Sequence, residues 1–286
     1  MPSSTRLSLV RAAVLLGAIA LAGCESKLSV ELATEAPADP AITTIQVALE
    51  GVEFQKDNGD VERLTFDEPQ SVNLMSLVNG NFDRLFTEEE LPDGRYSGVR
   101  LLLTEDEDID NVIVRNDGRE FDLALATESD FSDVSFTVDK DESSDDAIVL
   151  TLDLRQSLPF DDDDTTLTPV LRAVRDEAAG GVAGGVRVSC PSNSSLAVYL
   201  FSGENQVPDD LDGADAEPYL TSTVAGIDPS TTNSYAFSFL PAGRYTLATT
   251  CRGDDERPGS SEDLDFRNTT NVRVEAEETV RVDLTN

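Results

Sequence analysis

Apolar and polar residues alternate along most of the chain, in short runs that are separated by turn residues. In residues 42–54, Ile45, Val47 and Leu49 alternate with other residues, as the buried face of a strand requires. Short strands that are separated by turn signals, with no helical pattern between them, favour a β-sandwich or a β-barrel without βαβ units. The pattern predicts a mainly β protein with two β-sandwich-like domains in tandem. Further strands are predicted at 61–66, 91–103, 112–114, 121–125, 134–139, 147–158, 186–190, 195–201, 234–240, 244–251, 271–275 and 279–284.

Two stretches of the first domain depart from the period of two. The first, at 71–86, mixes a short strand with apolar residues at helix-like spacing, and a glycine inside it keeps the predicted helix short. The second, 167–174, fits either one face of a helix or an extended strand. The first domain is therefore expected to hold one or two short helices. The apolar residues concerned are Leu77, Val78, Phe82 and Leu85, and then Leu167, Val170, Leu171 and Val174.

Turn signals divide the chain, and one of them occurs twice. LPDGRY at 91–96 returns as LPAGRY at 240–245, and in each copy proline and glycine form a tight turn before the tyrosine starts a strand. Asn116-Asp117-Gly118 predicts a hairpin turn, and Ala276-Glu277-Glu278 is expected to join a closing hairpin.

The domain boundary is expected at two pairs of glycines. Gly180-Gly181 and Gly184-Gly185 indicate a flexible joint. Residues 25–40 are polar, contain proline and alanine, and predict a flexible tether. The expected organisation is an N-terminal signal segment at 1–23, a modified cysteine and tether at 24–40, a first β-rich domain at 41–182 and a second β-sandwich at 183–286.

The N-terminus has the order of a secretory signal peptide. Arg6 and Arg11 precede an apolar run that is too short for a comfortable transmembrane helix, and Gly23-Cys24 follows. The stretch Leu21-Ala22-Gly23-Cys24 resembles the bacterial lipoprotein box, which implies cleavage before Cys24 and acylation of that residue. Several acyl chains on one residue would anchor the protein stably in a membrane. Glu25 stands where aspartate would be the inner-membrane retention signal, which favours the outer membrane.

The charge of the chain is strongly negative. With 21 Lys and Arg against 56 Asp and Glu, the net charge is −35. Such a chain repels polyanions, so nucleic acid is excluded as a partner. The acids fit either a surface adapted to high salt or sites for divalent cations.

Histidine and tryptophan are both absent from the sequence. The chain therefore lacks the usual general base near neutral pH, the commonest transition-metal ligand and the best aromatic platform for sugars. These absences argue against an enzyme. A carboxylate pair could still process glycans, but the sequence cannot select one pair among 56 acids.

With Cys24 assigned to lipid, two cysteines remain. Cys190 and Cys251 end alternating segments, and an oxidising compartment favours a disulfide between them over two free thiols. A disulfide that closes this loop of roughly 60 residues should stabilise the fold by about 4 kcal/mol.

Acidic loops are the candidate calcium sites, and no other cofactor is expected. Asp106, Asp108 and Asp110 occupy alternate positions, although the residues that follow lack the glycine and glutamate of an EF-hand. Both this loop and the later acidic run fit hydrated loops as well as calcium ligands. That run comprises Asp161, Asp162, Asp163 and Asp164, and a weaker candidate comprises Asp209, Asp210, Asp212 and Asp215.

Four ordered motifs carry a family resemblance over residues 41–182. VNLMSLVNG at 72–80, LPDGRYSGVRLLL at 91–103, LTLDLRQSL at 150–158 and LTPVLRAV at 167–174 resemble the bacterial family called domain of unknown function 4382. That family is common in lipoproteins, and the resemblance implies no activity. FSFLPAGRYTLAT at 237–249 and VRVEAEETVRVDL at 272–284 resemble a transthyretin-like, carboxypeptidase regulatory-like β-sandwich, which implies an accessory module.

These observations predict an envelope lipoprotein without catalytic activity. It would be held to the membrane by its N-terminal lipid and would present its modules to an envelope protein or glycan. One alternative is a calcium-dependent adhesion module that uses the acidic loops. The other is a carboxylate-based enzyme acting on glycans.

Overall fold

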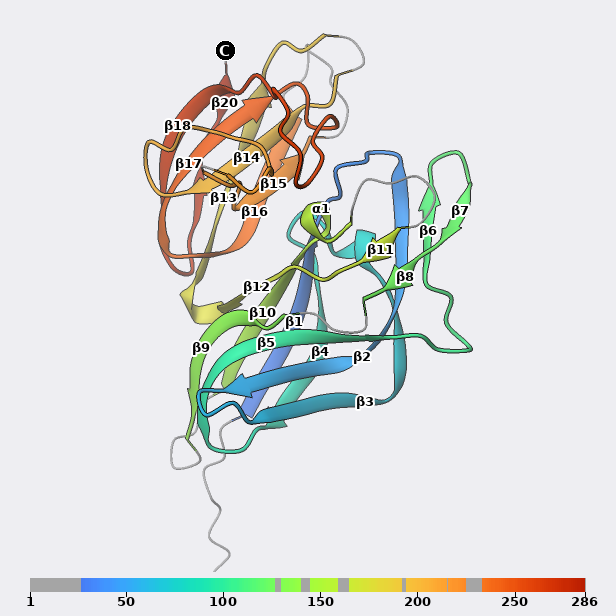
Figure 1. The fold of residues 1–286 in the computed structure, drawn as a ribbon. Helices are drawn as coiled ribbons and strands as arrows, with labels where there is room; N and C mark the ends of the chain where they lie inside the picture. Colours follow the sequence, from blue (N-terminus) through green and yellow to red (C-terminus); the bar gives the residue numbers. More distant parts are fainter. Residues whose placement is uncertain are drawn as a thin grey trace, which may run out of the picture.

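The computed structural model describes residues 27–126, 130–139, 145–158, 165–191, 194–214, 216–224 and 233–285. In this part of the chain the protein is mainly β and forms two β-sandwich modules in tandem, which confirms the predicted fold class. Figure 1 shows the second module, with strands β13 to β20, stacked on one end of the first. The helix α1 (Leu154–Ser157) lies between them. Every described helix is too short to cross a membrane.

The first module packs a sheet of four strands against a larger sheet. In the four-stranded sheet β1 lies in the interior, parallel to β10 on one side and antiparallel to β4 on the other. Its order is β12 (Leu171–Arg175), β10 (Asp145–Asp153), β1 (Lys27–Glu35) and β4 (Phe82–Glu90). The larger sheet has the order β7 (Glu120–Asp122), β6 (Val112–Arg115), β2 (Ile42–Lys56), β5 (Gly94–Thr104) and β9 (Ser132–Val138), and β3 (Val61–Asn73) pairs with the other edge of β2.

One continuous apolar core joins the two sheets of the first module. Leu28, Val30 and Leu32 of β1 contribute to it from one sheet, and Val52 and Phe54 of β2 from the other. A small parallel pair, β8 (Ala124–Leu125) with β11 (Thr166–Leu167), lies beside this core, which also buries Leu125 and Leu167.

The prediction of a flexible tether at 24–40 is wrong for most of its length. Residues 27–35 form β1, whose partner β10 lies more than 100 residues later in the chain. Leu28, Val30 and Leu32 do alternate, but three apolar positions among polar neighbours give only a weak local signal. The parallel pairing that makes this strand interior is invisible in the local sequence.

The short helix expected within 71–86 is also wrong over most of its length. A single 3₁₀ turn, η1 (Leu74–Leu77), is followed by β4, and Asn73 caps the turn by accepting a hydrogen bond from the Met75 amide at 3.1 Å. The ambiguous stretch 167–174 leads into the strand β12. In both places pairing with β1 or β10 decides the conformation, as tertiary context commonly overrides local preference.

The second module consists of two further sheets. The glycine-rich segment that was predicted to be a joint is a strand in one of them, β13, which follows the short turn η2 (Asp176–Ala178). The first sheet has the order β16 (Asn233–Pro241), β13 (Ala179–Arg187) and β19 (Thr279–Arg281), and β20 (Leu284–Thr285) also pairs with β13. The second sheet has the order β15 (Leu220–Thr223), β14 (Ala197–Ser202), β17 (Gly243–Thr250) and β18 (Arg267–Val274).

The glycines of β13 permit close packing and do not form a joint. A Cβ atom at Gly184 would lie 1.7 Å from the Val282 carbonyl oxygen, and one at Gly180 would lie 2.2 Å from that of Glu275. Only a residue without a side chain allows the C-terminal segment to approach so closely. The boundary between the modules therefore lies before β13, near η2.

The repeated turn ends in the same hydrogen bond in both modules. The Tyr96 hydroxyl donates to the Pro92 carbonyl at 2.6 Å, and the Tyr245 hydroxyl donates to the Pro241 carbonyl at 2.7 Å. Both tyrosines are buried, so the bond satisfies a polar group that would otherwise lack a partner. The repeat is therefore a structural device of each sandwich.

One predicted hairpin is confirmed and one is wrong. Asn116-Asp117-Gly118 connects β6 to β7, with Gly118 at a φ of 82°. The segment at 276–278 instead connects β18 in one sheet to β19 in the other, and Glu277 takes a φ of 60°. Two alternating strands around a short loop do not reveal whether they pair with each other.

Candidate functional site at the junction of the modules

Arg155 projects from the first module into the second, where it is almost completely buried. Its helix α1 begins directly after β10, and the Asp153 side chain caps the helix by accepting a hydrogen bond from the Gln156 amide at 3.0 Å. Only 2% of Arg155 is exposed. A buried guanidinium is strongly unfavourable unless it is paired and hydrogen-bonded.

The second module supplies those partners. Arg155 Nη1 donates to Glu256 Oε2 at 2.7 Å and to the Gly253 carbonyl at 2.9 Å, and the Tyr199 hydroxyl donates to the same Glu256 oxygen at 2.6 Å. Burial raises the pKa of the Glu256 carboxyl, and the Arg155 guanidinium opposes that rise. The other Glu256 oxygen accepts a hydrogen bond from the Leu211 amide at 3.1 Å. An arginine of the first module thus completes a polar cluster inside the second.

A second charged group lies beside this pair, at the end of β1. Arg172 donates to Asp153 at 2.9 Å, and its guanidinium lies 3.9 Å from Glu35 Oε1. Glu35 Oε2 accepts a hydrogen bond from the Thr221 amide of the second module at 3.1 Å. Burial and the nearby Asp153 raise the pKa of Glu35 to about 8, against the opposing effect of Arg172. Glu35 is therefore mostly protonated at neutral pH, which lowers the cost of burying it.

The junction also contains an aromatic and apolar contact. The Phe82 ring of β4 meets the Phe239 ring of β16 edge to face at 5.8 Å, and Phe239 packs against a cluster that includes Ala33 and Val149. Phe239 has a φ of 56°, which is unfavourable for a bulky residue and must be held by the surrounding packing.

The junction leaves little space for a ligand. Its cavity, lined by residues such as Glu35, Thr221 and Phe239, measures about 30 Å³. That volume holds a water molecule or two and is far below the size of a metabolite site. The buried charges of the junction therefore hold the modules together and do not line an open cleft.

A larger and more polar groove lies between the outer strands β3 and β4. Its volume is about 800 Å³, and Phe66 and Phe86 stack beside it with ring centres 4.6 Å apart. Arg84 at its wall donates to Glu31 of β1 at 2.5 Å. The charged residues of these strands and Pro69 in β3 are features that discourage pairing with another strand.

The first predicted calcium loop does not gather its carboxylates. Asp106 Oδ1 accepts a hydrogen bond from the Asp108 amide at 2.9 Å, and Asn111 ties the loop to β2 by accepting from the Ala48 amide at 2.7 Å. Asp108 and Asp110 are exposed. Among the described residues, a mutually close group of three acids forms only at Asp209, Asp210 and Asp212.

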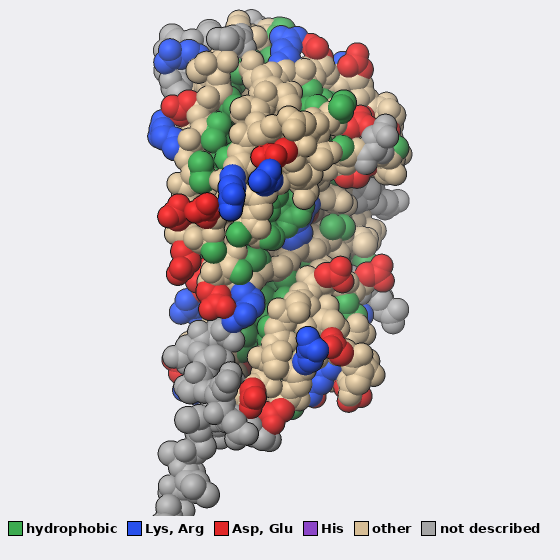
Figure 2. Space-filling view, turned by 90° about the vertical axis from the view of Figure 1, so that its left-hand side faces the viewer, with side chains coloured by type: hydrophobic (Ala, Val, Ile, Leu, Met, Phe, Trp, Pro, Cys, Tyr) green, Lys and Arg blue, Asp and Glu red, His purple; other side chains and the backbone are tan. Residues whose placement is uncertain are grey.

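The remaining acids are widely spread. Figure 2 shows a face on which acidic and basic side chains lie interspersed, with apolar side chains visible between them. Two further sets of predicted site residues lie outside the described residues: Asp161, Asp162, Asp163, Asp164 and Asp215 among the acids, and the predicted lipidation site Cys24.

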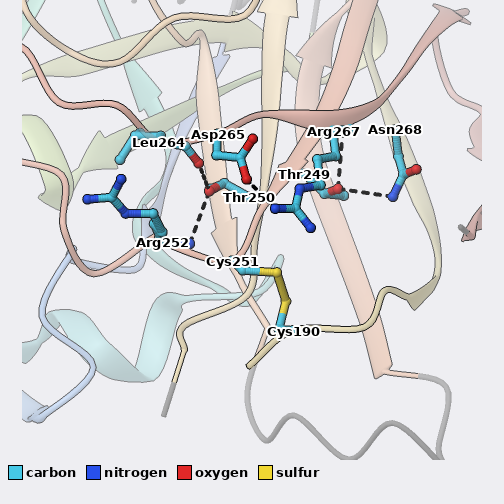
Figure 3. Close-up of a disulfide and its surroundings, with 9 residues drawn as sticks. All are labelled: Cys190, Thr249, Thr250, Cys251, Arg252, Leu264, Asp265, Arg267 and Asn268. Carbon is cyan, nitrogen blue, oxygen red and sulfur yellow. Dashed lines mark hydrogen bonds and ion pairs between the residues drawn. A yellow bond between two sulfur atoms is a disulfide. The ribbon is translucent and has the colours of Figure 1, made fainter. Parts of the chain in front are cut away.

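The predicted disulfide between Cys190 and Cys251 is present in the second module. Their Cα atoms are 5.5 Å apart, and the bridge links the segment after β13 to the end of β17, so it connects the two sheets (Figure 3). Beside it the Thr250 hydroxyl donates to the Leu264 carbonyl and accepts from the Arg252 amide. The bridge thereby holds a loop that also carries Glu256.

Comparison with known sequences places the chain in a family. The profile of the domain of unknown function DUF4382 matches residues 25–169, which is about half of the chain. The chain belongs to the DUF4382 family. The match includes β1, in agreement with its place inside the first module, and it ends before β12. No curated protein matches the sequence.

Several solved structures of bacterial proteins have partial likeness to this chain. The GBS52 minor pilin of Streptococcus agalactiae has 13% identity and a TM-score of 0.22, with 90% of this chain and 94% of that chain covered. A putative adhesin from Bacteroides ovatus has 10% identity and a TM-score of 0.22, with coverage of 92% and 94%. The Bacillus anthracis TIE protein has 11% identity and a TM-score of 0.22, with 91% of this chain covered, but this chain spans only 34% of its length. These TM-scores lie below the level that marks a shared fold.

Arg155 and Glu256 had no predicted role. Arg155 lies within the DUF4382-like motif LTLDLRQSL, and its partner is 101 residues away. The only available signal for a role of Arg155 was its place at the end of an apolar strand, with no acidic residue after it at helical spacing. The identity of the partner required the tertiary structure.

Proposed function

We propose that this chain is a lipid-anchored protein of the cell envelope that acts without catalysis and presents two docked β-sandwich modules to a protein or glycan partner. The lipoprotein box at residues 21–24 supports the anchor. The closed, charge-paired junction supports a role in which the modules form one scaffold. The second module, with its two sheets and the LPAGRY corner, would serve as a transthyretin-like accessory domain.

The observation that carries the proposal is the direction of β1. Lys27, its first residue, pairs with Glu90 and Asp145, whereas Glu35, its last, contacts Thr221 of the second module. The strand therefore runs from the far end of the first module toward the junction, as Figure 1 shows. A lipid at Cys24, three residues before Lys27, would anchor that far end.

This geometry limits the distance between the protein and the membrane. Three residues span about 10 Å even when they are fully extended. The first module would therefore lie close to the membrane surface, and the second module would be held away from it by the junction. The outer membrane is favoured because Glu25 follows the modified cysteine.

The proposal can be tested by measuring acylation and membrane location in one experiment. Cells expressing the full chain would be labelled with an alkyne-bearing palmitate analogue, and their inner and outer membranes separated on a density gradient. The protein should carry label and sediment with the outer membrane, and Cys24→Ser should abolish the label. Glu25→Asp is the matched control, which should retain the label and move toward the inner membrane. An unlabelled protein in the cytosolic fraction would refute the anchor.

The partner can be sought with the same protein. Chemical crosslinking in intact envelopes, followed by recovery of the acylated chain, should yield a defined protein or glycan adduct. Loss of the adduct in Arg155→Met, with acylation unchanged and the chain still folded by circular dichroism, would show that the docked arrangement is what the partner recognises. An adduct that is unchanged in this variant would assign recognition to one module alone.

A further inference from the structure

Three carboxylates of the second module converge in the loop between β14 and β15. One oxygen from each of Asp209, Asp210 and Asp212 lies within 4.8 Å of the others. A calcium ion binds oxygen at about 2.4 Å, so two ligands on opposite sides of the ion are about 4.8 Å apart. Three oxygens at such separations lie within about 2.8 Å of a common point, so a single ion can contact all three carboxylates after at most a small shift of their side chains.

The middle carboxylate has a buried oxygen without a hydrogen bond. Asp210 is fully buried, and its Oδ2 accepts a hydrogen bond from the Glu262 amide. Its Oδ1 is also buried and has no hydrogen-bond partner among the described residues. Because an unsatisfied buried oxygen is costly, and most costly when it is charged, this atom would gain from contact with a cation.

The three carboxylates repel one another, and a cation would offset that repulsion. They lie close together, and the middle one, Asp210, is fully buried. No basic side chain forms an ion pair with Asp209, Asp210 or Asp212 in the part of the chain that the structure describes.

Backbone hydrogen bonds already orient these acids. Asp209 Oδ1 accepts from the Asp210 amide at 3.1 Å, and Asp212 Oδ1 accepts from the Ala214 amide at 2.8 Å. Glu217 Oε1 accepts from the Gly213 amide at 2.6 Å. Each of these side chains keeps a second oxygen for an ion, so binding would require little ordering of the loop.

We propose that Asp209, Asp210 and Asp212 bind one calcium ion, with Asp210 Oδ1 as the buried ligand. The oxygen-only ligand set suits a hard cation. Calcium is favoured over magnesium because it accepts irregular geometry, whereas magnesium demands a near-ideal octahedron and gives up water reluctantly. Water molecules or Glu217 would complete the coordination.

The site is connected to the module junction through Leu211. The Leu211 amide, between two of the ligands, donates to Glu256, which pairs with Arg155 of the first module. The Leu211 carbonyl accepts from the Gly259 amide at 2.6 Å. An ion that orders Asp210 and Asp212 would therefore also stabilise the loop segment that holds Glu256 at the junction.

Calorimetric titration of the full chain with calcium chloride, in 0.5 M sodium chloride to screen diffuse charge, tests the site. One calcium ion should bind per chain, and saturation should raise the melting temperature by about 5 °C. Magnesium chloride should bind at least about tenfold more weakly. Asp210→Asn keeps an oxygen for the Glu262 amide but loses the charge, and it should weaken calcium binding more than about tenfold.

Two further variants keep the test decisive. Asp212→Asn changes a less buried ligand, so it remains informative if Asp210→Asn fails to fold, and it should also weaken binding more than about tenfold. Asp108→Asn, in the other acidic loop, is the matched control and should bind as the wild type does. The proposal is overturned if calcium gives neither heat nor a melting shift, or if Asp108→Asn loses as much binding as Asp212→Asn. Because the readout does not depend on acylation, it can fail while the lipid anchor stands.

Discussion

Replacing Arg155 by methionine should strongly destabilise the protein. Methionine fills part of the same space but leaves the fully buried Glu256 without its cation and the Gly253 carbonyl without its donor. Removing one partner of a buried ion pair costs about 3–5 kcal/mol. Since a typical domain is stable by about 5–15 kcal/mol, such a loss is readily measured.

The loss should depend on pH, because Glu256 can take up a proton. In the variant, burial is no longer opposed by the guanidinium, so the pKa of Glu256 should rise further above its ordinary value of 4.5. A carboxyl whose folded pKa is raised destabilises the fold as pH increases above the unfolded value. Arg155→Met should therefore lose more stability at pH 8 than at pH 5.

Urea unfolding monitored by circular dichroism measures both effects. Arg244→Met is the matched control, because Arg244 pairs with Glu204 at 2.8 Å while its side chain is 59% exposed. The control should lose no more than about 1 kcal/mol. The double variant Arg155→Met/Glu256→Gln should recover part of the lost stability, since it removes the unpaired charge. A denaturation midpoint of Arg155→Met equal to that of the wild type, or a loss that is the same at both pH values, would refute the reasoning.

Three other perturbations have defined outcomes. Because the pKa of Glu35 is raised to about 8, the free energy of unfolding of the wild type should fall as pH rises from about 4.5 to about 8. Glu35→Gln should remove about 4 kcal/mol of the fall between pH 5 and 8. Urea unfolding that shows the same pH dependence for the wild type and Glu35→Gln would contradict this. Tyr96→Phe and Tyr245→Phe should each cost about 0.5–1.5 kcal/mol, because a buried tyrosine loses its hydrogen bond to a partly exposed proline carbonyl, and unchanged melting temperatures would deny that role. Replacing both Cys190 and Cys251 by serine should cost about 4 kcal/mol, and a reductant should destabilise the wild type but not this variant.

Local pattern was sufficient for the fold class and for several turns. Alternation marks which face of a strand is buried, and glycine and proline mark where strands end, as at Asn116-Asp117-Gly118. The even pair of cysteines was enough to predict the disulfide. These features depend on residues close in sequence, or on a count.

Local pattern failed where the neighbours of a segment are distant in sequence. β1 resembled a tether because its interior position depends on parallel pairing with β10. The glycines of β13 resembled a joint because the carbonyl groups that require them belong to the C-terminal segment. The composition of a segment limits which conformations it can adopt, and packing against distant segments decides which of these conformations it takes.

The candidate sites show the same division. The sequence by itself determined a β-rich, acidic chain with a lipoprotein-like start, a cysteine pair and several acidic loops, among which it ranked the loop of Asp209, Asp210 and Asp212 lowest. Only the tertiary structure decided that Arg155 meets Glu256 across the junction. It also decided that Asp210 has a buried oxygen with no hydrogen-bond partner among the described residues, whereas Asp108 is exposed. The physical reason is that burial and charge pairing depend on what surrounds a side chain in space, and most of those surroundings come from residues far away in the sequence.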